Sequence, residues 1–168
     1  MERSKKTALI ALARVLATAR VPYAIIGGIA VQVHRREPRT TLDIDVALVD
    51  LRVLPRDALV AAGFSHTGSY AHSENWQGPE QTPVQFTADA ALAAAVSRAG
   101  EIDVEGTPLR VVSKVDLVRQ KLRAGSDPAR RRSKQLQDLA DAQALIEDDP
   151  GLLPQLSDDE RAILQRIS

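Results

Sequence analysis

The sequence predicts an α+β fold in which a small mixed β-sheet carries helices and is followed by a helical C-terminal lobe. Short apolar runs that are typical of strands concentrate in the first two thirds of the 168 residues, and helical spacing dominates the last third. A composition of 44% hydrophobic and 26% charged residues, without cysteine, is typical of a globular chain that needs no disulfide. We expect an α+β domain over 1–112 and a helical lobe over 113–168 that packs on it.

Hydrophobic periodicity, punctuated by glycine and proline, places the elements of the first two thirds. Spacings of three and four residues indicate a helix, and strict alternation indicates a half-buried strand. These signals predict a helix over 4–19 that Pro22 ends, a strand over 23–26, a glycine turn at 27–28, a helix over 29–35, a strand over 39–49, a short helix over 55–62, a loop-rich stretch over 65–83 with room for one weak strand, a strand over 83–87 and a helix over 90–99.

Turn and capping signals place the remaining elements. The apolar segments 102–105 and 109–112 flank Gly-Thr-Pro and predict a hairpin. Ser113 followed by Asp116, and Ser157 followed by Glu160, are capping-box patterns that open helices. We therefore expect helices over 113–123, 129–147 and 157–167.

Charge is balanced overall but uneven along the chain. Lys plus Arg equals Asp plus Glu at 22 each, so bulk charge predicts neither a general nucleic-acid binder nor an acidic surface. A basic patch lies between Arg119 and Lys134, and its run from Arg130 predicts a solvated helix start or, as the alternative, contact with an RNA backbone. Without an unbroken apolar run, a secretion signal or cysteine, we expect a cytoplasmic protein that is not inserted in a membrane.

The feature with the clearest chemical meaning is Asp43-Ile44-Asp45. Alternation along the predicted strand puts both carboxylates on one face, together with Arg39 and Thr41. Two like charges about 6.6 to 7 Å apart at the backbone are reconciled by a divalent cation such as Mg²⁺ or Mn²⁺ that also binds substrate phosphates. The simpler interpretation of such a pair alone is a solvated polar face.

Gly27-Gly28 stands at the predicted junction of a strand and a helix. Free backbone N–H groups and the positive helix end make such a junction an anion site, and glycine allows close approach of a phosphate. Alone, a glycine pair is more often a turn. In combination with the two aspartates it predicts a site for a metal-bound nucleoside triphosphate (NTP).

The segment YAIIGGIAVQVHRREPRTTLDIDVALV, residues 23–49, resembles the nucleotidyltransferases of the DNA polymerase beta superfamily, especially the AbiEii-type toxins and their relatives. The resemblance implies a nucleotidyltransferase fold in which Asp43 and Asp45 bind Mg²⁺ or Mn²⁺. It also implies that Gly27 and Gly28 hold the β and γ phosphates, with support from Arg39 and Thr41.

A second part of the resemblance lies in the last third of the chain. Lys121, followed by Lys134, Asp138 and Asp141, is similar to the C-terminal Lys and Asp-x-x-Asp motif of AbiEii-like proteins. The last three residues share a helix face, for which a surface stripe of salt bridges is the simpler interpretation. The resemblance implies that Lys121 contacts the triphosphate and acts in catalysis, and that Asp138 or Asp141 orients the nucleotide.

One position departs from the superfamily pattern. Its members carry a third carboxylate on the strand after the metal pair, which completes the metal site and accepts a proton. The aligned residue here is Gln85, which cannot accept a proton. Either Asp89, Glu74 or Glu80 replaces that carboxylate, or catalysis is weak, or the protein binds nucleotide only.

These observations predict a Mg²⁺-dependent enzyme that transfers a nucleoside monophosphate from an NTP to an acceptor. The resemblance implies an RNA acceptor such as tRNA, and a toxin that pairs with an antitoxin protein. Two alternatives stay open. One is a non-catalytic member of the fold that binds nucleotide or protein, and the other is a nucleotidyltransferase that modifies a small molecule such as an antibiotic.

Overall fold

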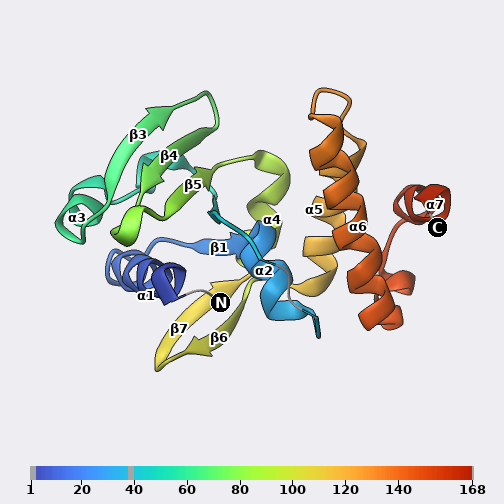
Figure 1. Ribbon diagram of the computed structural model, residues 1–168, viewed down its shortest axis with the longest axis horizontal. Coiled ribbons are helices and arrows are strands. Elements are labelled where there is room, and N and C mark those ends of the chain that lie inside the picture. The colour runs from blue at the N-terminus through green and yellow to red at the C-terminus, as the bar shows by residue number, and fades with distance from the viewer. Residues whose placement is uncertain (1–2, 38–39, 168) are drawn as a thin grey trace.

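A computed structural model describes residues 3–37 and 40–167 and has a seven-stranded mixed sheet at its centre (Figure 1). The strand order is β3-β4-β5-β2-β1-β7-β6. The strands are β1 (Tyr23–Ile26), β2 (Ile44–Leu48), β3 (Ser65–Ser69), β4 (Ser73–Gln77), β5 (Pro83–Thr87), β6 (Gly100–Val104) and β7 (Thr107–Val111). The predicted α+β class with a mixed sheet is therefore confirmed.

The two central strands are apolar because the fold buries both of their faces. All four residues of β1 are buried, and Ile44, Val46, Ala47 and Leu48 of β2 are fully shielded. β1 pairs antiparallel with β2, while β2 pairs parallel with β5 and β1 pairs parallel with β7. This arrangement places the end of β1 and the beginning of β2 side by side, with Ile26 opposite Asp45.

Helices cover the sheet and form the last third of the chain. They are α1 (Arg3–Thr18), α2 (Gly27–His34), α3 (Arg56–Ala61), α4 (Ala93–Ser97), α5 (Lys114–Ser126), α6 (Arg132–Asp148) and α7 (Asp158–Ile167), with 3₁₀ turns at Leu51–Val53, Pro79–Gln81, Ala90–Leu92 and Pro150–Gln155. Both α2 and α4 contact β1 and β2, and α5 packs along α6 beside the sheet (Figure 1).

Both predicted serine N-caps are present, and the second forms a complete capping box. The Ser113 hydroxyl accepts a hydrogen bond from the backbone N–H of Asp116, and Ser157 and Glu160 cap each other reciprocally before α7. Among residues 3–37 and 40–167, no helix combines the length and the apolar character that crossing a membrane requires.

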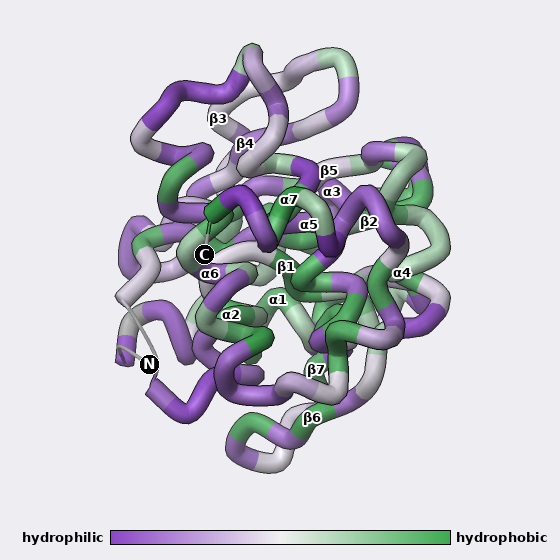
Figure 2. Tube along the Cα trace, turned by 90° about the vertical axis from the view of Figure 1, so that its right-hand side faces the viewer, coloured by the Kyte–Doolittle hydropathy of each residue, from purple (hydrophilic) through white to green (hydrophobic). Residues whose placement is uncertain are grey.

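The structure corrects the prediction for residues 65–83, where we expected loops and one weak strand. β3 and β4 form an antiparallel hairpin that extends the sheet from β5. Figure 2 shows that hydrophilic residues dominate both strands, so hydropathy alone carries little strand signal there. The hairpin is formed by pairing with β5 and by burial of Trp76, both of which are tertiary effects.

A second correction concerns the strand predicted over 39–49. β2 begins only at Ile44, and Leu42, which the alternation assigned to the buried face, is 72% exposed. Asp43 therefore precedes the strand rather than lying within it. Arg39 lies outside the described residues.

We predict that Gly125→Ala destabilises the packing of α5 on α6. A Cβ at Gly125 would lie 2.6 Å from Leu139 Cγ and 3.2 Å from the Gln135 carbonyl oxygen. Overpacking of this kind costs about 1–3 kcal/mol, which exceeds the gain of about 0.5–1 kcal/mol from replacing a helical glycine. Urea unfolding should show a lower midpoint. Gly100→Ala is the control, because its Cβ would meet nothing within 4 Å, and equal stability of the two variants would contradict the prediction.

Candidate functional site

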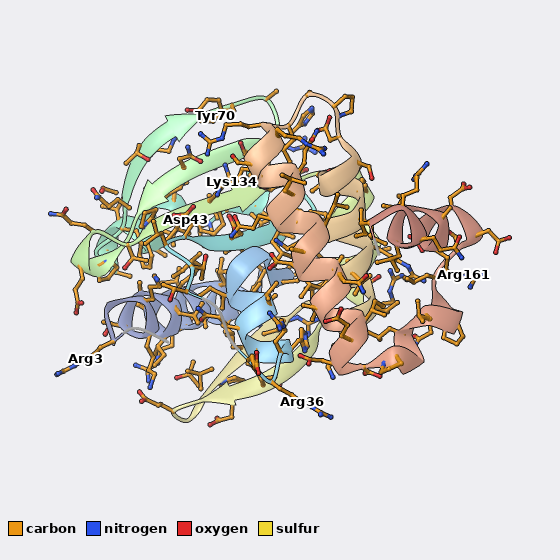
Figure 3. The ribbon with its side chains drawn as sticks, turned by 45° about the vertical axis from the view of Figure 1, so that its right-hand side comes forward. Arg3, Arg36, Asp43, Tyr70, Lys134 and Arg161 are labelled. Carbon is orange, nitrogen blue, oxygen red and sulfur yellow. The ribbon has the colours of Figure 1, made fainter. Side chains whose placement is uncertain are left out.

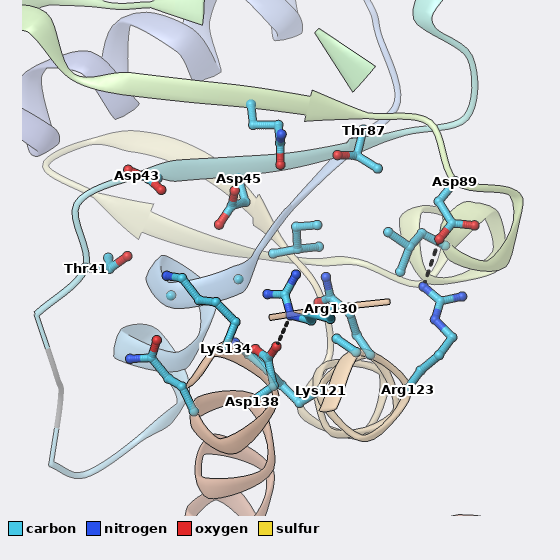
Figure 4. A pocket seen from close by; sticks show the side chains of 18 residues that line it. Thr41, Asp43, Asp45, Thr87, Asp89, Lys121, Arg123, Arg130, Lys134 and Asp138 are labelled. Atoms are coloured by element: carbon cyan, nitrogen blue, oxygen red, sulfur yellow. Dashed lines mark hydrogen bonds and ion pairs between the residues drawn. The ribbon is translucent and has the colours of Figure 1, made fainter. Parts of the chain in front are cut away.

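A cleft of about 240 Å³ separates the sheet from α5 and α6 (Figure 4). The N-terminal part of the chain contributes its floor through Gly27, Gly28, Thr41, Asp43, Asp45 and Gln85. The helical part contributes the opposite wall through Gln120, Lys121, Arg123, Arg130, Lys134 and Asp138. Most of the predicted site residues are thus brought together from segments that are up to 111 positions apart.

Asp43 and Asp45 both line this cleft. Asp45 points from β2 and is half-buried, whereas Asp43 stands just before the strand and is exposed. Burial raises the pKa of Asp45 to about 6, and the neighbouring charge of Asp43 adds to that rise. The fold therefore holds an ionised carboxylate at a place that disfavours its charge.

Gly27 and Gly28 form a surface that only glycine can provide. Gly27 has φ +63°, and a Cβ there would lie 2.2 Å from Asp45 Oδ2. A Cβ at Gly28 would lie 2.3 Å from Thr41 Oγ1. The first residues of α2 consequently expose backbone N–H groups beside the carboxylates, which is the geometry of an anion site.

Cations face the aspartates from across the cleft. Arg130 lies before α6 and Lys134 in its first turn, and Figure 4 shows both, with Lys121, on the side opposite Asp43 and Asp45. Figure 3 shows the exposed pair Asp43 and Lys134 between the sheet and α6. The positive charges of Lys121, Arg130 and Lys134 partly oppose the rise in the pKa of Asp45, so the two walls interact electrostatically.

Lys121 has partners within the protein. It is only 6% exposed, and its Nζ lies 2.8 Å from Asp138 Oδ1 and 2.9 Å from Asp141 Oδ2. Asp138 also accepts a hydrogen bond of 2.6 Å from Arg130 Nε. Asp138 and Asp141 of the predicted face therefore belong to a buried ionic cluster that ties α6 to α5, whereas Lys134 is exposed. Asp141 does not line the cleft, and the exposed cations that line it are Arg123, Arg130 and Lys134.

Gln85 lies directly beside Asp45 in the register of β2 and β5. Its Nε2 donates a hydrogen bond of 3.1 Å to Asn75 Oδ1 on β4. The position at which the resemblance implies a third carboxylate is thus occupied by an amide, which a second amide holds in place.

None of the three suggested replacements stands at that position. Glu74 is buried in an ion pair with Arg56 and accepts a hydrogen bond from the Trp76 indole, and Glu80 lies in a 3₁₀ turn away from the cleft. Asp89 lines the cleft but lies beyond the end of β5, where it pairs with Arg123 at 3.1 Å. Within the described ranges, no three His, Cys, Asp or Glu residues cluster in a way that could hold a metal ion.

Part of the lining of the cleft is uncharged. Leu92 and Ala124 line it, together with Gln120, whose Oε1 is buried and has no hydrogen-bond partner among residues 3–37 and 40–167. A buried acceptor without a partner is costly unless a ligand satisfies it. Apolar side chains and an amide residue therefore line the cleft in addition to its charged groups.

The donor set fits a hard divalent cation. Asp43 and Asp45 offer carboxylate oxygens, the ligand type that Mg²⁺ and Mn²⁺ prefer, and the glycine surface next to them leaves room for phosphate oxygens. The sequence did not single out Arg130 within its basic run, and it carried no signal for Asn75, because the β3–β4 hairpin was not expected.

The amino-acid sequence matches no family model and no curated protein. Solved structures are similar in fold. An antigenic nucleotidyltransferase-like protein from Paracoccidioides brasiliensis aligns with a TM-score of 0.60 at 18% identity, over 96% of this chain and 92% of that one. The Helicobacter pylori protein JHP933 aligns with a TM-score of 0.63 at 14% identity, over 99% and 75%.

A third similar structure is ANT(2")-Ia in complex with adenylyl-2"-tobramycin. It aligns with a TM-score of 0.56 at 17% identity, and the alignment covers 98% of this chain and 99% of that one. At these identities the likeness shows the fold, and the chain has the fold of the nucleotidyltransferases.

We predict that Lys121→Met lowers stability by about 3 kcal/mol, because Asp138 and Asp141 would keep their buried charges without this cation. Chemical denaturation would measure the loss. Lys114→Met is the control, since Lys114 pairs with Asp149 at 3.5 Å near the surface, where such pairs contribute less than about 1 kcal/mol. If Lys121→Met leaves stability unchanged but abolishes triphosphate binding, the result would instead support the contact between Lys121 and the triphosphate that the resemblance implies.

We predict that Asp45→Asn stabilises the metal-free protein above pH 6. The pKa of Asp45 is about 6 in the folded protein, whereas an aspartate ordinarily has a pKa of 3.8, so the folded protein loses stability as pH rises through this interval. Removing the charge should recover about 1–3 kcal/mol at pH 8, and the gain should vanish below about pH 4. Thermal unfolding in EDTA across pH 4–8 measures this. Asp43→Asn should gain less, and a pH-independent difference for Asp45→Asn would contradict the assignment.

Proposed function

We propose, from the nucleotidyltransferase fold of this chain, that it transfers a nucleoside monophosphate from an NTP to an acceptor hydroxyl with the help of Mg²⁺. One observation carries the proposal. Asp43 and Asp45 face Arg130 and Lys134 across a single cleft, with the Gly27-Gly28 surface between them. Anionic and cationic walls around a backbone anion site are complementary to a metal-bound triphosphate.

Each part of the cleft takes one part of the nucleotide. The N-terminus of α2 at Gly27 and Gly28 binds phosphate oxygens through backbone N–H groups, and Thr41 supports this surface. Arg130 and Lys134 neutralise the remaining phosphate charge. Asp43 and Asp45 hold the metal, which when bound neutralises developing charge on the phosphates. Leu92, Ala124 and Gln120 receive the base.

The reaction is an in-line displacement at the α phosphorus. The acceptor oxygen forms a bond to this phosphorus while the bond to the bridging oxygen of the β phosphate breaks, and pyrophosphate leaves with that electron pair. Gln85 cannot take the hydroxyl proton, which passes to solvent at the exposed rim near Asp43. The chain then contributes positioning and charge complementarity rather than a strong general base.

The proposal extends to a biological role through the resemblance to AbiEii-type toxins. In that role the acceptor is an RNA such as tRNA, and an antitoxin protein restrains the enzyme. The exposed cations Arg130, Arg131 and Arg132 at the start of α6 support an approach of RNA beside the cleft. The antibiotic acceptor remains the small-molecule version of the same chemistry, and ANT(2")-Ia carries such a product in its structure.

A second candidate function is nucleotide binding without transfer. Gln85 at the position beside Asp45 favours it, because the pair of carboxylates lacks a third acidic neighbour within the described ranges. Such a protein would still bind NTP with Mg²⁺ in the same cleft.

The test supplies each of the four NTPs, labelled at the α phosphate, with Mg²⁺ or Mn²⁺ and either total RNA, purified tRNA or an aminoglycoside. We expect labelled acceptor from the wild type and none from Asp43→Ala/Asp45→Ala. Asp50→Ala is the matched control, because Asp50 pairs with exposed Arg52 away from the cleft. Its activity should equal that of the wild type.

The outcomes separate the two candidate functions. Label on RNA or on the aminoglycoside that disappears in the double variant supports the transferase. Calorimetric binding of a non-hydrolysable NTP that needs both aspartates, without label on any acceptor, overturns the transferase and supports the binding protein. Label that persists in the double variant would place the chemistry elsewhere.

A further inference from the structure

A second cavity adjoins the nucleotide cleft at the aspartate pair and extends toward the β3–β4 hairpin. We infer that this cavity, between β2, β5 and the β3–β4 hairpin, is the acceptor site, and that the Asn75–Gln85 amide pair selects a neutral ring that carries hydroxyl groups. The inference rests on the proposed function and specifies its acceptor.

The two cavities share one wall. Asp43, Asp45 and Gln85 line both the nucleotide cleft and the second cavity. A molecule in the second cavity therefore meets the same carboxylates as the triphosphate, and it is held by the β3–β4 hairpin and β5 rather than by α5 and α6. Transfer requires this relation, since the nucleophile must stand opposite the leaving pyrophosphate at the α phosphorus.

Sheet register builds the polar surface of this second cavity. Asn75 lies opposite Gln85 on β4 and β5, and Gln85 lies opposite Asp45 on β2, so three polar residues form one row across the sheet. The hydrogen bond of 3.1 Å from Gln85 Nε2 to Asn75 Oδ1 fixes both amides. The Asn75 NH₂ group and the Gln85 carbonyl oxygen are the donor and acceptor that this bond does not use, and they match a hydroxyl group.

The charge of the lining indicates what kind of molecule binds. Apart from Asp43 and Asp45, whose charge a bound cation offsets, the described lining consists of uncharged residues, among them Thr67 and the edge of buried Trp76. No lysine or arginine lines this cavity within the described ranges, whereas Arg130 and Lys134 lie on the nucleotide side. A phosphate would lack a cation here, and a polycation would lack a carboxylate that is not already engaged by metal.

The lining of the cavity, rather than its size, limits the acceptor further. Its volume of about 240 Å³ equals that of the nucleotide cleft, so the uncharged polar surface selects a ring that carries hydroxyl groups. A terminal ribose of an RNA and a free sugar-like molecule share this chemistry. In both cases a ring hydroxyl is the nucleophile, its oxygen bonds to the α phosphorus as pyrophosphate departs, and its proton passes to solvent.

Binding can be measured without any transfer. The ¹⁵N-labelled protein, with Mg²⁺ and a non-hydrolysable ATP analogue bound, is titrated with uridine as the neutral ring and with tobramycin as the polycation. We expect uridine to shift the side-chain NH₂ signals of Asn75 and Gln85, which are identified by their loss in Asn75→Leu and Gln85→Leu. Tobramycin should leave them in place.

Variants test whether the amide pair selects the acceptor. Asn75→Leu should weaken uridine binding about five- to tenfold, the effect of one lost hydrogen bond, without changing affinity for the ATP analogue. Gln77→Leu on the same strand is the matched control, since Gln77 does not line the cavity and uridine affinity should stay unchanged. Gln85→Glu, an exposed and nearly isosteric change, should raise tobramycin affinity by at least tenfold.

The inference fails if uridine moves neither signal, if tobramycin binds the wild type more tightly, or if Asn75→Leu and Gln77→Leu behave alike. Uridine binding without label transfer would count against the proposed reaction alone, and label transfer that is unaffected by Asn75→Leu would count against the acceptor site alone.

A comparison of RNA that has an intact terminal ribose with periodate-oxidised RNA and with free uridine identifies which source of the ring is labelled. Label on either source supports the neutral-ring acceptor.

Discussion

The site depends on one electrostatic conflict, in which the fold holds Asp45 ionised at a half-buried position beside Asp43. Burial and the neighbouring charge together raise the pKa of Asp45 to about 6. A chain selected for stability alone would place an uncharged residue at this position of β2. Positive charge relieves this conflict, and the facing wall of the cleft supplies some through Arg130 and Lys134, while the divalent ion that we propose would supply more.

The position of that facing wall is set by a second ionic group, which is buried and internally neutralised. Lys121 of α5 holds Asp138 and Asp141 of α6, while Asp138 also holds Arg130. Because a buried charge without its partner is strongly unfavourable, the cluster favours one register of α5 against α6. Residues that resemble a ligand-binding motif thus hold α6 in place, and with it Arg130 and Lys134, which we propose as the cations that meet the phosphates.

The sequence predicts those parts of the fold and site that depend on local periodicity and short spacing. The buried strand β1 is predicted by its apolar run, and the serine caps of α5 and α7 are predicted by a serine followed three residues later by an acid. Gly27, Gly28 and Asp45 lie together because β1 and β2 are adjacent strands and the segment between them is local in sequence. The β3–β4 hairpin could not be predicted in this way, since its hydrophilic residues become strands only by pairing with β5. The enclosure of Lys121 by two aspartates could not be predicted either, because sequence spacing does not reveal which side chains pair between α5 and α6.

The structural role of Gln85 depends on the β3–β4 hairpin, which was not predicted. From the sequence alone, Gln85 stands where a carboxylate is expected, and the chain therefore lacks a proton acceptor at this position. In the sheet it is the middle of a row from Asn75 to Asp45, and its amide is held by a hydrogen bond that a carboxylate could not donate. Gln85 in place of a carboxylate therefore gives the second cavity an uncharged surface, on which the amides of Gln85 and Asn75 are held in fixed orientations. A third carboxylate would bring a negative charge to the wall that the two cavities share. Gln85 therefore has two consequences, because it removes a proton acceptor from the nucleotide cleft and it gives the proposed acceptor site its preference for a neutral ring.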